Sequence, residues 1–490
     1  PDATREWLRF DCFDEAPNWH LAPEGRDERH PLDERGDPVE ETLAQLHGPL
    51  GPLLERAGAD PETLRALQAD PVEAGEDEAT LHDLEQALRH RPARVSELDL
   101  AVLRRRRSEK WHTYPEDVLP LWVADMDFRS PPAVIAALHE RADHGVFGYT
   151  AVPQDLVREV QSQLKEKYDW VIEEEWLVWL PGLVTGLNVA CRAVGNEYDR
   201  VLTAVPVYPP FLKAPGYSGR LLTTVPLTCS DGQGTDEADT DGHRSDVYWQ
   251  MDFDRIQRAV TPDTRLYILC HPHNPVGRVF GRNELTDLAA ICEKHDIVVC
   301  SDEIHCELIL EPDKRHVPFA TLAPEIADRT ITLMAPSKTY NIPGLGCSFA
   351  VISNAHLRQR FKSAMAGIVP MVNAMGFAAA LAAYRHGGDW HEALLDYLRK
   401  NRDAVTMAIN SMPAVAMTPI EATYLAWIDI RATGLTDPIA FFEAAGVGLS
   451  DGREFGGPGY VRFNFGCSRS VLVEALERMR KALAERRLVS

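Results

Sequence analysis

From about residue 97 onward, short apolar runs alternate with stretches in which apolar residues recur every three or four positions. Short apolar runs predict buried strands, and the three-to-four spacing predicts amphipathic helices. We expect strands over 201–205, 266–270, 297–300 and 330–334, and helices over 186–194 and 283–295. Strand, helix and strand in this order predict an α/β fold, with a mostly parallel sheet covered by helices on both faces.

Residues 371–490 read as further helices and short strands, the latter over 424–428 and 461–465, which suit a second, smaller α/β domain. Residues 1–95 differ from both regions. Apolar residues at helical spacing occur over 39–57, 61–69 and 76–89, each stretch broken by Gly or Pro. We therefore predict an N-terminal helical extension that acts as a cap or docking domain. A disordered acidic tail is the alternative that the pattern leaves open.

The distribution of charge supports the division between residues 1–95 and the rest of the chain. The chain has a net charge of −23, and residues 1–100 alone hold 25 acidic and 10 basic side chains. An acidic chain lacks the basic footprint that nucleic-acid binding requires. No apolar run approaches the roughly 20 residues of a membrane span, and no basic region followed by an apolar stretch marks a secretory signal. The nine cysteines contain no CxxC pair, so we expect free thiols in the cytoplasm.

The first candidate for chemistry is Lys338, in the run APSKTYN that follows the predicted strand 330–334. A lysine at a strand end, flanked by small residues, can point into a cleft and form a Schiff base if its pKa is depressed. Taken alone, Lys338 reads more readily as a solvated loop lysine. A Ser–Lys hydrolase pair with Ser337 is a further alternative, although adjacent side chains rarely face one another.

Asp302 begins the run DEIH after the predicted strand 297–300. A carboxylate at a buried strand end costs free energy unless it meets a cation. A protonated pyridine nitrogen would supply that cation, and a lysine Schiff base with an acidic pyridinium partner is the arrangement of pyridoxal-phosphate (PLP) enzymes. An Asp that merely caps a turn is the alternative.

The run HPHNPVGR over 271–278 contains a His-x-His pair, but no third ligand at suitable spacing supports a metal site. Its rigid turn can instead aim the amide of Asn274 at a ligand oxygen. The run PGLVTG over 181–186 leads into a predicted helix, whose first backbone N–H groups can bind a phosphate. Tyr208 can stack on a flat ring. Arg462, alone in an apolar strand, can bind a planar carboxylate.

The order of these motifs is phosphate loop, Tyr, Asn, Asp, Lys and Arg. In this order the chain resembles the fold-type I PLP enzymes, the aspartate aminotransferase superfamily, over about residues 97–485. Within it the runs LPLWVADMDF (119–128), GVFGY (145–149), DEIH and SKT resemble the MalY/PatB-type cystathionine β-lyases, also called C–S lyases. Typical aminotransferases carry Tyr where His305 stands here and a phosphate-binding Arg where Gly346 stands; the lyase subgroup shares both departures.

The resemblance implies a seven-stranded large PLP-binding domain over 141–370, an arm with part of the small domain over 96–140, and the rest of the small domain over 371–490. It implies that Lys338 forms the Schiff base and removes the α-proton, Asp302 pairs with the pyridine nitrogen, and Arg462 binds the α-carboxylate. Asn274 would bond the phenolic oxygen and Tyr208 would stack on the ring, with His305 nearby. The residues implied for the phosphate are Leu183, Val184, Ser337 and, across a homodimer interface, Tyr149.

The implied activity is cleavage of the carbon–sulfur bond of an S-substituted cysteine to thiol, pyruvate and ammonia, in the cytoplasm. The N-terminal segment departs from the family, and we expect it to dock a partner or an assembly-line domain in sulfur natural-product biosynthesis. An aminotransferase or a decarboxylating deaminase is the enzyme alternative. A binding module that kept the fold is the non-enzyme alternative, against which stand Lys338, Asp302 and Arg462.

Overall fold

The computed structural model describes residues 8–11, 18–21, 28–31, 95, 97–98, 100–105, 108–229 and 248–489 of the chain. The chain divides into two compact units, Pro1–Ala93 and Arg94–Ser490. In the first unit, the described residues form an antiparallel sheet of β1 (Leu8–Asp11), β2 (Asn18–Leu21) and β3 (Glu28–Pro31). These strands were not expected from the sequence, and the three predicted helices lie outside the described residues.

The second unit is built on a seven-stranded sheet with the order β5-β13-β12-β11-β10-β6-β7. Its strands are β5 (Leu177–Leu180), β13 (Ser348–Val351), β12 (Thr330–Met334), β11 (Val298–Asp302), β10 (Thr264–Cys270), β6 (Arg200–Val205) and β7 (Leu221–Pro226). Only β13 runs antiparallel to its neighbours. The predicted α/β fold with a mostly parallel seven-stranded sheet is confirmed.

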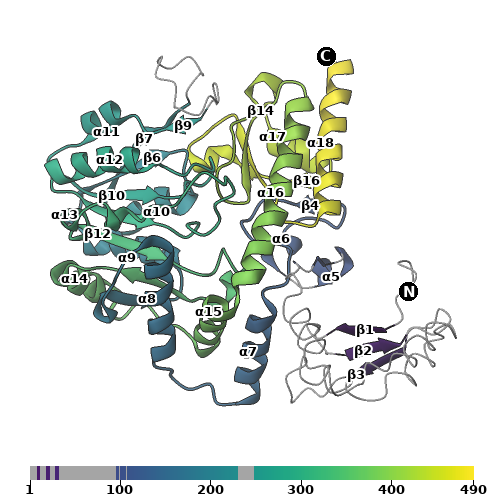
Figure 1. The fold of residues 1–490 in the computed structure, drawn as a ribbon. Helices are drawn as coiled ribbons and strands as arrows, with labels where there is room; N and C mark the ends of the chain where they lie inside the picture. Colours follow the sequence, from purple (N-terminus) through teal and green to yellow (C-terminus); the bar gives the residue numbers. More distant parts are fainter. Residues whose placement is uncertain are drawn as a thin grey trace. The chain divides into compact units, whose positions relative to one another are not determined.

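Helices cover both faces of this sheet (Figure 1). On one face lie α9 (Leu183–Ala193), α10 (Pro209–Tyr217) and α14 (Ala355–Met365). On the other face lie α11 (Phe253–Ala259), α12 (Arg282–Lys294) and α13 (Pro324–Ala327). Alternation along β10 explains the two cores, because Leu266 and Ile268 pack with the first set of helices, whereas Tyr267 and Leu269 pack with the second.

The smaller sheet has the order β14-β15-β18-β17 and is antiparallel. Its strands are β14 (Ala416–Met417), β15 (Leu425–Asp429), β18 (Tyr460–Asn464) and β17 (Ser450–Asp451). Helices α16 (Gly388–Ser411), α17 (Pro438–Ala444) and α18 (Arg469–Val489) accompany it (Figure 1). The short strand β4 (Leu119–Pro120) pairs in parallel with β16 (Val447–Gly448), so the arm that precedes the large sheet joins this smaller domain.

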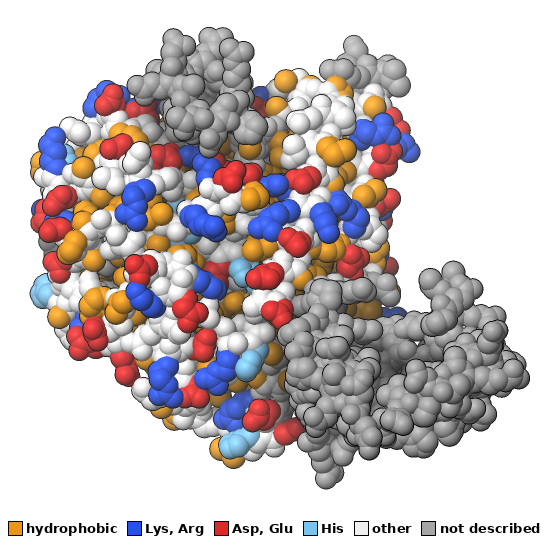
Figure 2. Space-filling view, in the orientation of Figure 1, with side chains coloured by type: hydrophobic (Ala, Val, Ile, Leu, Met, Phe, Trp, Pro, Cys, Tyr) orange, Lys and Arg blue, Asp and Glu red, His pale blue; other side chains and the backbone are white. Residues whose placement is uncertain are grey.

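The remaining described elements connect these parts. They are α5 (Leu100–Arg105), α6 (Glu109–His112), α7 (Pro132–Asp143), α8 (Gln154–Tyr168), β8 (Thr228–Cys229), β9 (Trp249–Gln250) and α15 (Ala374–His386), with five short 3-10 turns at Glu174–Trp176, Phe319–Thr321, Pro343–Leu345, Arg431–Thr433 and Gly452–Phe455. Within the described part of the chain, no helix combines the length and apolar character needed to cross a membrane. On the face drawn in Figure 2, Lys and Arg side chains are interspersed with Asp and Glu rather than gathered in one patch.

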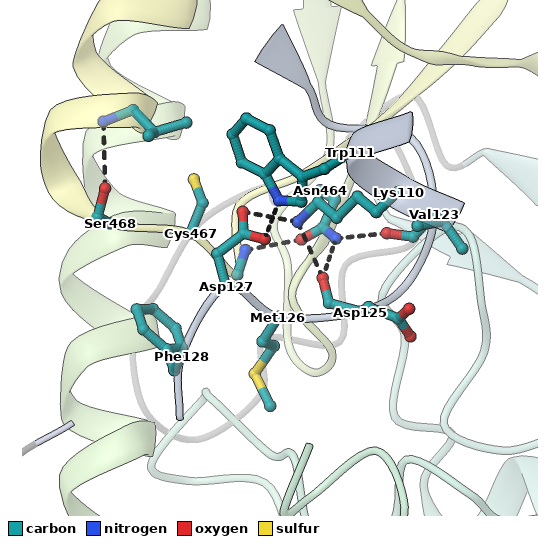
Figure 3. Close-up of polar contacts among 12 residues, drawn as sticks. Lys110, Trp111, Val123, Asp125, Met126, Asp127, Phe128, Asn464, Cys467 and Ser468 are labelled. Atoms are coloured by element: carbon teal, nitrogen blue, oxygen red, sulfur yellow. Dashed lines mark hydrogen bonds and ion pairs between the residues drawn. The ribbon is translucent and has the colours of Figure 1, made fainter. Parts of the chain in front are cut away.

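A buried ion pair joins two segments of the arm, α6 and the run 119–128 (Figure 3). Lys110 Nζ lies 2.8 Å from Asp127 Oδ2, and Trp111 Nε1 donates a 2.8 Å hydrogen bond to Asp127 Oδ1. Both side chains of the pair are only 2% exposed. Burial raises the pKa of Asp127, and the bonds from Lys110 and Trp111 offset only part of that effect. The pair therefore specifies how α6 lies against the run 119–128 more than it adds net stability.

We expect Asp127→Ala to lower the free energy of unfolding by about 3–5 kcal/mol, because it leaves the Lys110 ammonium buried without its partner. The double variant Lys110→Met/Asp127→Leu should recover most of that loss. The matched control is Asp396→Ala at the exposed helical pair Arg399–Asp396, where the expected change is at most about 1 kcal/mol. Denaturant unfolding measures all three. Equal losses at Asp127 and Asp396 would contradict this account of the pair.

Candidate active site

The candidate residues meet at the carboxyl edge of the large sheet. Asp302 is the last residue of β11, the central strand, and it is opposite Cys270 of β10 and Leu333 of β12. Asn274 follows β10 and Lys338 follows β12, so three adjacent strands deliver the three side chains to one place. This edge is where ligands bind in parallel sheets of this kind.

Lys338 lies at this edge with 19% of its side chain exposed. Its Nζ donates a 2.6 Å hydrogen bond to the backbone oxygen of Ala124 and lies 3.7 Å from Asp125 Oδ1. Burial lowers the pKa of Lys338, and the carboxylate of Asp125 partly opposes this effect. A depressed pKa increases the fraction of unprotonated amine, which is the nucleophilic and basic form.

Asp302 is 5% exposed, and its Oδ1 accepts a 3.2 Å hydrogen bond from the backbone N–H of Ile304. Among the described residues it forms no ion pair, although Lys338 is near enough to favour its ionised form. Burial raises the pKa of Asp302 to about 7. A buried carboxylate in this state would be stabilised by a cation at the sheet edge, so the role expected for Asp302 remains a prediction.

Arg462 comes from β18 of the smaller sheet and reaches the same place. Its guanidinium donates to Asn274 Oδ1 at 3.1 Å, to the backbone oxygen of Trp122 at 2.8 Å and to Ser450 Oγ at 3.3 Å. It also lies 4.7 Å from the centre of the Phe455 ring. Burial lowers the pKa of Arg462 to about 10, so it stays protonated at neutral pH. Its Nε has no hydrogen-bond partner among the described residues, which suits a planar anion.

The phosphate loop has the expected geometry. Gly182 is the N-cap of α9, and the backbone N–H groups of Leu183 and Val184 open this helix of 11 residues. A Cβ at Gly182 would meet nothing within 4 Å, so the cradle is open on that side. Gly346 has φ +63°, and a Cβ there would approach the Pro181 oxygen to 3.0 Å. An arginine at that position, which aminotransferases carry, would therefore be strained in this backbone conformation.

Two ring side chains have the placement expected of cofactor contacts. Tyr208 is the N-cap of α10, and burial raises its pKa, so it stays a neutral phenol. His305 is 2% exposed, and burial, with Lys338 and Arg462 nearby, lowers its pKa to about 3. His305 is therefore neutral at the position of the aminotransferase tyrosine. Ser337 is 9% exposed beside Lys338.

Tyr149 is the most exposed of the candidates in this single chain, and Val184 is exposed as well, at 45%. Its side chain is 100% exposed, on the loop between α7 and α8, and Val146 and Phe147 beside it are 62% and 63% exposed. Ile368 and Met371 are exposed apolar side chains as well, at 56% and 64%. The expectation that Tyr149 serves a partner's site therefore remains a prediction.

Sequence reasoning used the run 119–128 only as a family signature and assigned it no role. The structure shows that residues 119–128 form one wall of the site, because Lys338 Nζ donates to the Ala124 oxygen and Arg462 donates to the Trp122 oxygen. Figure 3 shows contacts that hold this wall in place. Asn464 Nδ2 donates to the oxygens of Val123 and Asp125 at 2.6 and 2.7 Å, and Tyr424 donates to the Ala124 oxygen at 2.7 Å. In the sequence, only the run 119–128 could have indicated this wall. The side chains that donate hydrogen bonds to its backbone lie 300 to 341 residues away in the chain.

The side chains present fit PLP. Asp302 offers a buried carboxylate to a protonated pyridine nitrogen, Asn274 an amide to a ring oxygen, and α9 its N-terminal N–H groups to a phosphate. Lys338 is placed to form the Schiff base, and Arg462 has an unused N–H for a substrate carboxylate. By contrast, within the described ranges no cluster of His, Cys, Asp and Glu suits a metal ion.

Comparison with known proteins agrees with a PLP site. The family model of aminotransferase class I and II matches residues 116–479. Cystathionine beta-lyase PatB of Bacillus subtilis is 36% identical over 390 residues, which are 77% of this chain and 97% of PatB. A domain family of unknown function, DUF7700, matches residues 2–82, in the first unit.

Solved structures extend the match to three dimensions. The crystal structure of OvoB has 42% sequence identity and a TM-score of 0.74, covering 80% of this chain and 98% of that one. Cystalysin from Treponema denticola, whose structure contains a pyridoxal 5′-phosphate cofactor, has 32% identity and a TM-score of 0.73, covering 80% and 98%. The chain therefore belongs to the aminotransferase class I and II family, as a PLP-dependent enzyme of its branch of cystathionine β-lyases and other carbon–sulfur lyases.

Proposed function

We propose that this enzyme cleaves the Cβ–S bond of an S-substituted cysteine and, with one water, releases a thiol, pyruvate and ammonia. The observation that carries the proposal is the convergence of a basic lysine, Lys338, with a carboxylate-binding arginine, Arg462, at the sheet edge that ends in Asp302. The kinship with PatB and cystalysin supports the choice of sulfur as the leaving group.

Asp302, Arg462 and Lys338 have different roles in this reaction. PLP, when bound, withdraws electrons from the α-carbon of an amino acid, and Asp302 maintains this pull by pairing with the pyridine nitrogen. Arg462 binds the α-carboxylate and thereby orients the Cα–H bond toward Lys338. Lys338 Nζ takes the α-proton, the electron pair left on carbon forms the second bond of a Cα=Cβ double bond, and the sulfur departs with the pair of the Cβ–S bond. A thiolate leaves easily because its charge is stable near neutral pH.

Other side chains orient the reacting groups. Asn274 bonds the phenolic oxygen and, through its Oδ1, also fixes Arg462, so one amide aligns the cofactor with the substrate anchor. Tyr208 stacks on the ring, and neutral His305 adds no charge beside it. Leu183, Val184 and Ser337 bind the phosphate through uncharged donors.

A homodimer completes this site in our proposal. The support is the exposed apolar set of Val146, Phe147, Ile368 and Met371, together with the fully exposed Tyr149. Burial against a second copy would remove these side chains from water. Tyr149 would then bind the phosphate of the partner's cofactor. We place the activity in the cytoplasm, because the eight cysteines that the structure describes are free thiols and seven of them are buried.

We further propose that the first unit, residues 1–93, docks a partner or an assembly-line domain in the biosynthesis of a sulfur natural product. The support is that 77% of this chain already matches 97% of PatB, so the first unit is additional to a complete lyase body.

The decisive assay supplies S-ethylcysteine or cystathionine without a keto acid. We expect pyruvate and free thiol in equal amounts, and none from Lys338→Ala, which lacks the base. Pyruvate, thiol, carbon dioxide and pyridoxamine phosphate are measured together. Stoichiometric pyridoxamine phosphate without thiol would make the enzyme an aminotransferase, and release of carbon dioxide would make it a decarboxylating deaminase.

Asp302→Asn should keep the fold and slow α-proton removal by several orders of magnitude, because a neutral amide does not hold the pyridine nitrogen protonated. Exchange of the substrate α-hydrogen with deuterated water measures this step. Glu303→Gln is the matched control, since Glu303 is the buried neighbour whose carboxylate bonds Ser301, His316 and the Phe319 backbone instead. Near-normal exchange in Asp302→Asn would show that another group holds the nitrogen.

Deleting residues 1–95 should leave PLP bound, because every residue assigned to the cofactor lies in the second unit. Turnover of a small cysteine conjugate should persist within about threefold, whereas turnover with the natural partner or substrate should fall. The visible absorption of bound PLP and the thiol assay measure the two properties. A truncated protein without the cofactor absorption would show that the first unit is part of the lyase body.

A further inference from the structure

The carboxylate of Asp125 has a role that the assigned site does not yet use. Asp125 lies in the wall formed by residues 119–128, and 38% of its side chain is exposed toward the site. Among the described residues, Lys338 makes the one ion-pair contact of this carboxylate, at 3.7 Å. Ala124, next in the chain, accepts the 2.6 Å hydrogen bond from the same Lys338 Nζ.

The place of this carboxylate is set by its backbone, not by its own bonds (Figure 3). The backbone oxygen of Asp125 accepts hydrogen bonds from Asn464 Nδ2 at 2.7 Å and from Lys110 Nζ at 3.1 Å. The Asp125 N–H donates to the Val123 oxygen at 2.9 Å. A substitution that changes only the carboxylate therefore leaves the wall in place, and the charge itself can be tested.

Four charged or titratable groups act on the Lys338 amine or are affected by it. The carboxylates of Asp125 and Asp302 favour its ammonium form, whereas Arg462 disfavours it. His305 stays neutral there, since burial lowers its pKa to about 3. Burial has the largest effect on Lys338, and Asp125 is the strongest of the groups that oppose it. Replacing Asp125 by a neutral residue would lower the pKa of Lys338 further.

We propose that Asp125 is a positioning residue that acts through Lys338. After the lysine has taken the α-proton, Asp125 and the Ala124 oxygen hold it as an ammonium ion, so that sulfur is lost before the proton returns. The inference rests on the proposed lyase function.

The path of the α-proton explains why the charge of Asp125 affects amino transfer and sulfur loss differently. When the Cα–H bond breaks, its electron pair stays on the substrate and the proton forms a third N–H bond at Nζ. Amino transfer requires that Nζ give this proton up again, to the cofactor. Loss of the thiolate requires no such return, because the sulfur leaves with the C–S pair. A carboxylate beside the ammonium thus slows amino transfer without slowing sulfur loss.

The test compares Asp125→Asn, which removes the charge, with Asp125→Glu, which keeps it. The matched control is Asp117→Asn, at an exposed acid that precedes the same run of residues. The first readout needs no substrate: the visible absorption of bound PLP is titrated with pH. A protonated Schiff base at Lys338 is a cation, so loss of the neighbouring anion should move the midpoint to lower pH in Asp125→Asn only.

The second readout is the ratio of pyridoxamine phosphate to pyruvate formed from S-ethylcysteine. We expect this ratio to rise about tenfold in Asp125→Asn and to remain near the wild-type value in Asp125→Glu and Asp117→Asn, with unchanged thermal unfolding in all three. An unmoved midpoint would overturn the pairing of Asp125 with Lys338, and a moved midpoint with an unchanged ratio would overturn its effect on the outcome. If the wild type releases no thiol, the lyase proposal fails, while the titration still decides the pairing.

Discussion

The central strand of the large sheet ends in a buried carboxylate, and the other candidate residues surround it. Asp302 ends β11, the middle strand of seven, where it is 5% exposed and forms no ion pair with a described residue. Burying an unpaired charge is costly, which is why the pKa of Asp302 rises to about 7. In the proposed function, the protonated pyridine of PLP would remove this cost, so the same interaction would stabilise the site and activate the cofactor.

The neighbouring strands fix what surrounds that cation. Because β10 and β12 flank β11 in parallel, their carboxyl ends bring Asn274 and Lys338 to either side of Asp302. Arg462, which we propose binds the substrate carboxylate, comes from the smaller domain, and one hydrogen bond of 3.1 Å joins it to Asn274. In the proposed function, this contact between the two domains would align cofactor and substrate.

Much of this was predictable from the sequence, because strand periodicity locates the sheet edge at which ligands bind. The predicted strand over 330–334 agrees with β12, and the strands before Asn274 and Asp302 were misplaced by at most two residues. The wall formed by residues 119–128 was not predictable from periodicity. Its geometry comes from hydrogen bonds to Asn341, Tyr424 and Asn464, which lie 213 to 341 residues away in the chain. Likewise, the four-residue strands β1–β3 are too short for an alternation to be distinguished from loop sequence.

The departure from aminotransferases at Gly346 is a property of the backbone as much as of the side chain. With φ at +63° and the Pro181 oxygen 3.0 Å from the place of a Cβ, no arginine fits there without a shift of the phosphate loop itself. In the proposed function, the phosphate would be bound mainly by the N-terminal N–H groups of α9, whose partial charges are weaker than a guanidinium. A site that binds phosphate with neutral donors gains from a further hydrogen bond, and the exposed Tyr149 would offer one to a second copy in the proposed homodimer. The conformation of the phosphate loop and the formation of that dimer would thereby be linked through a single ligand group.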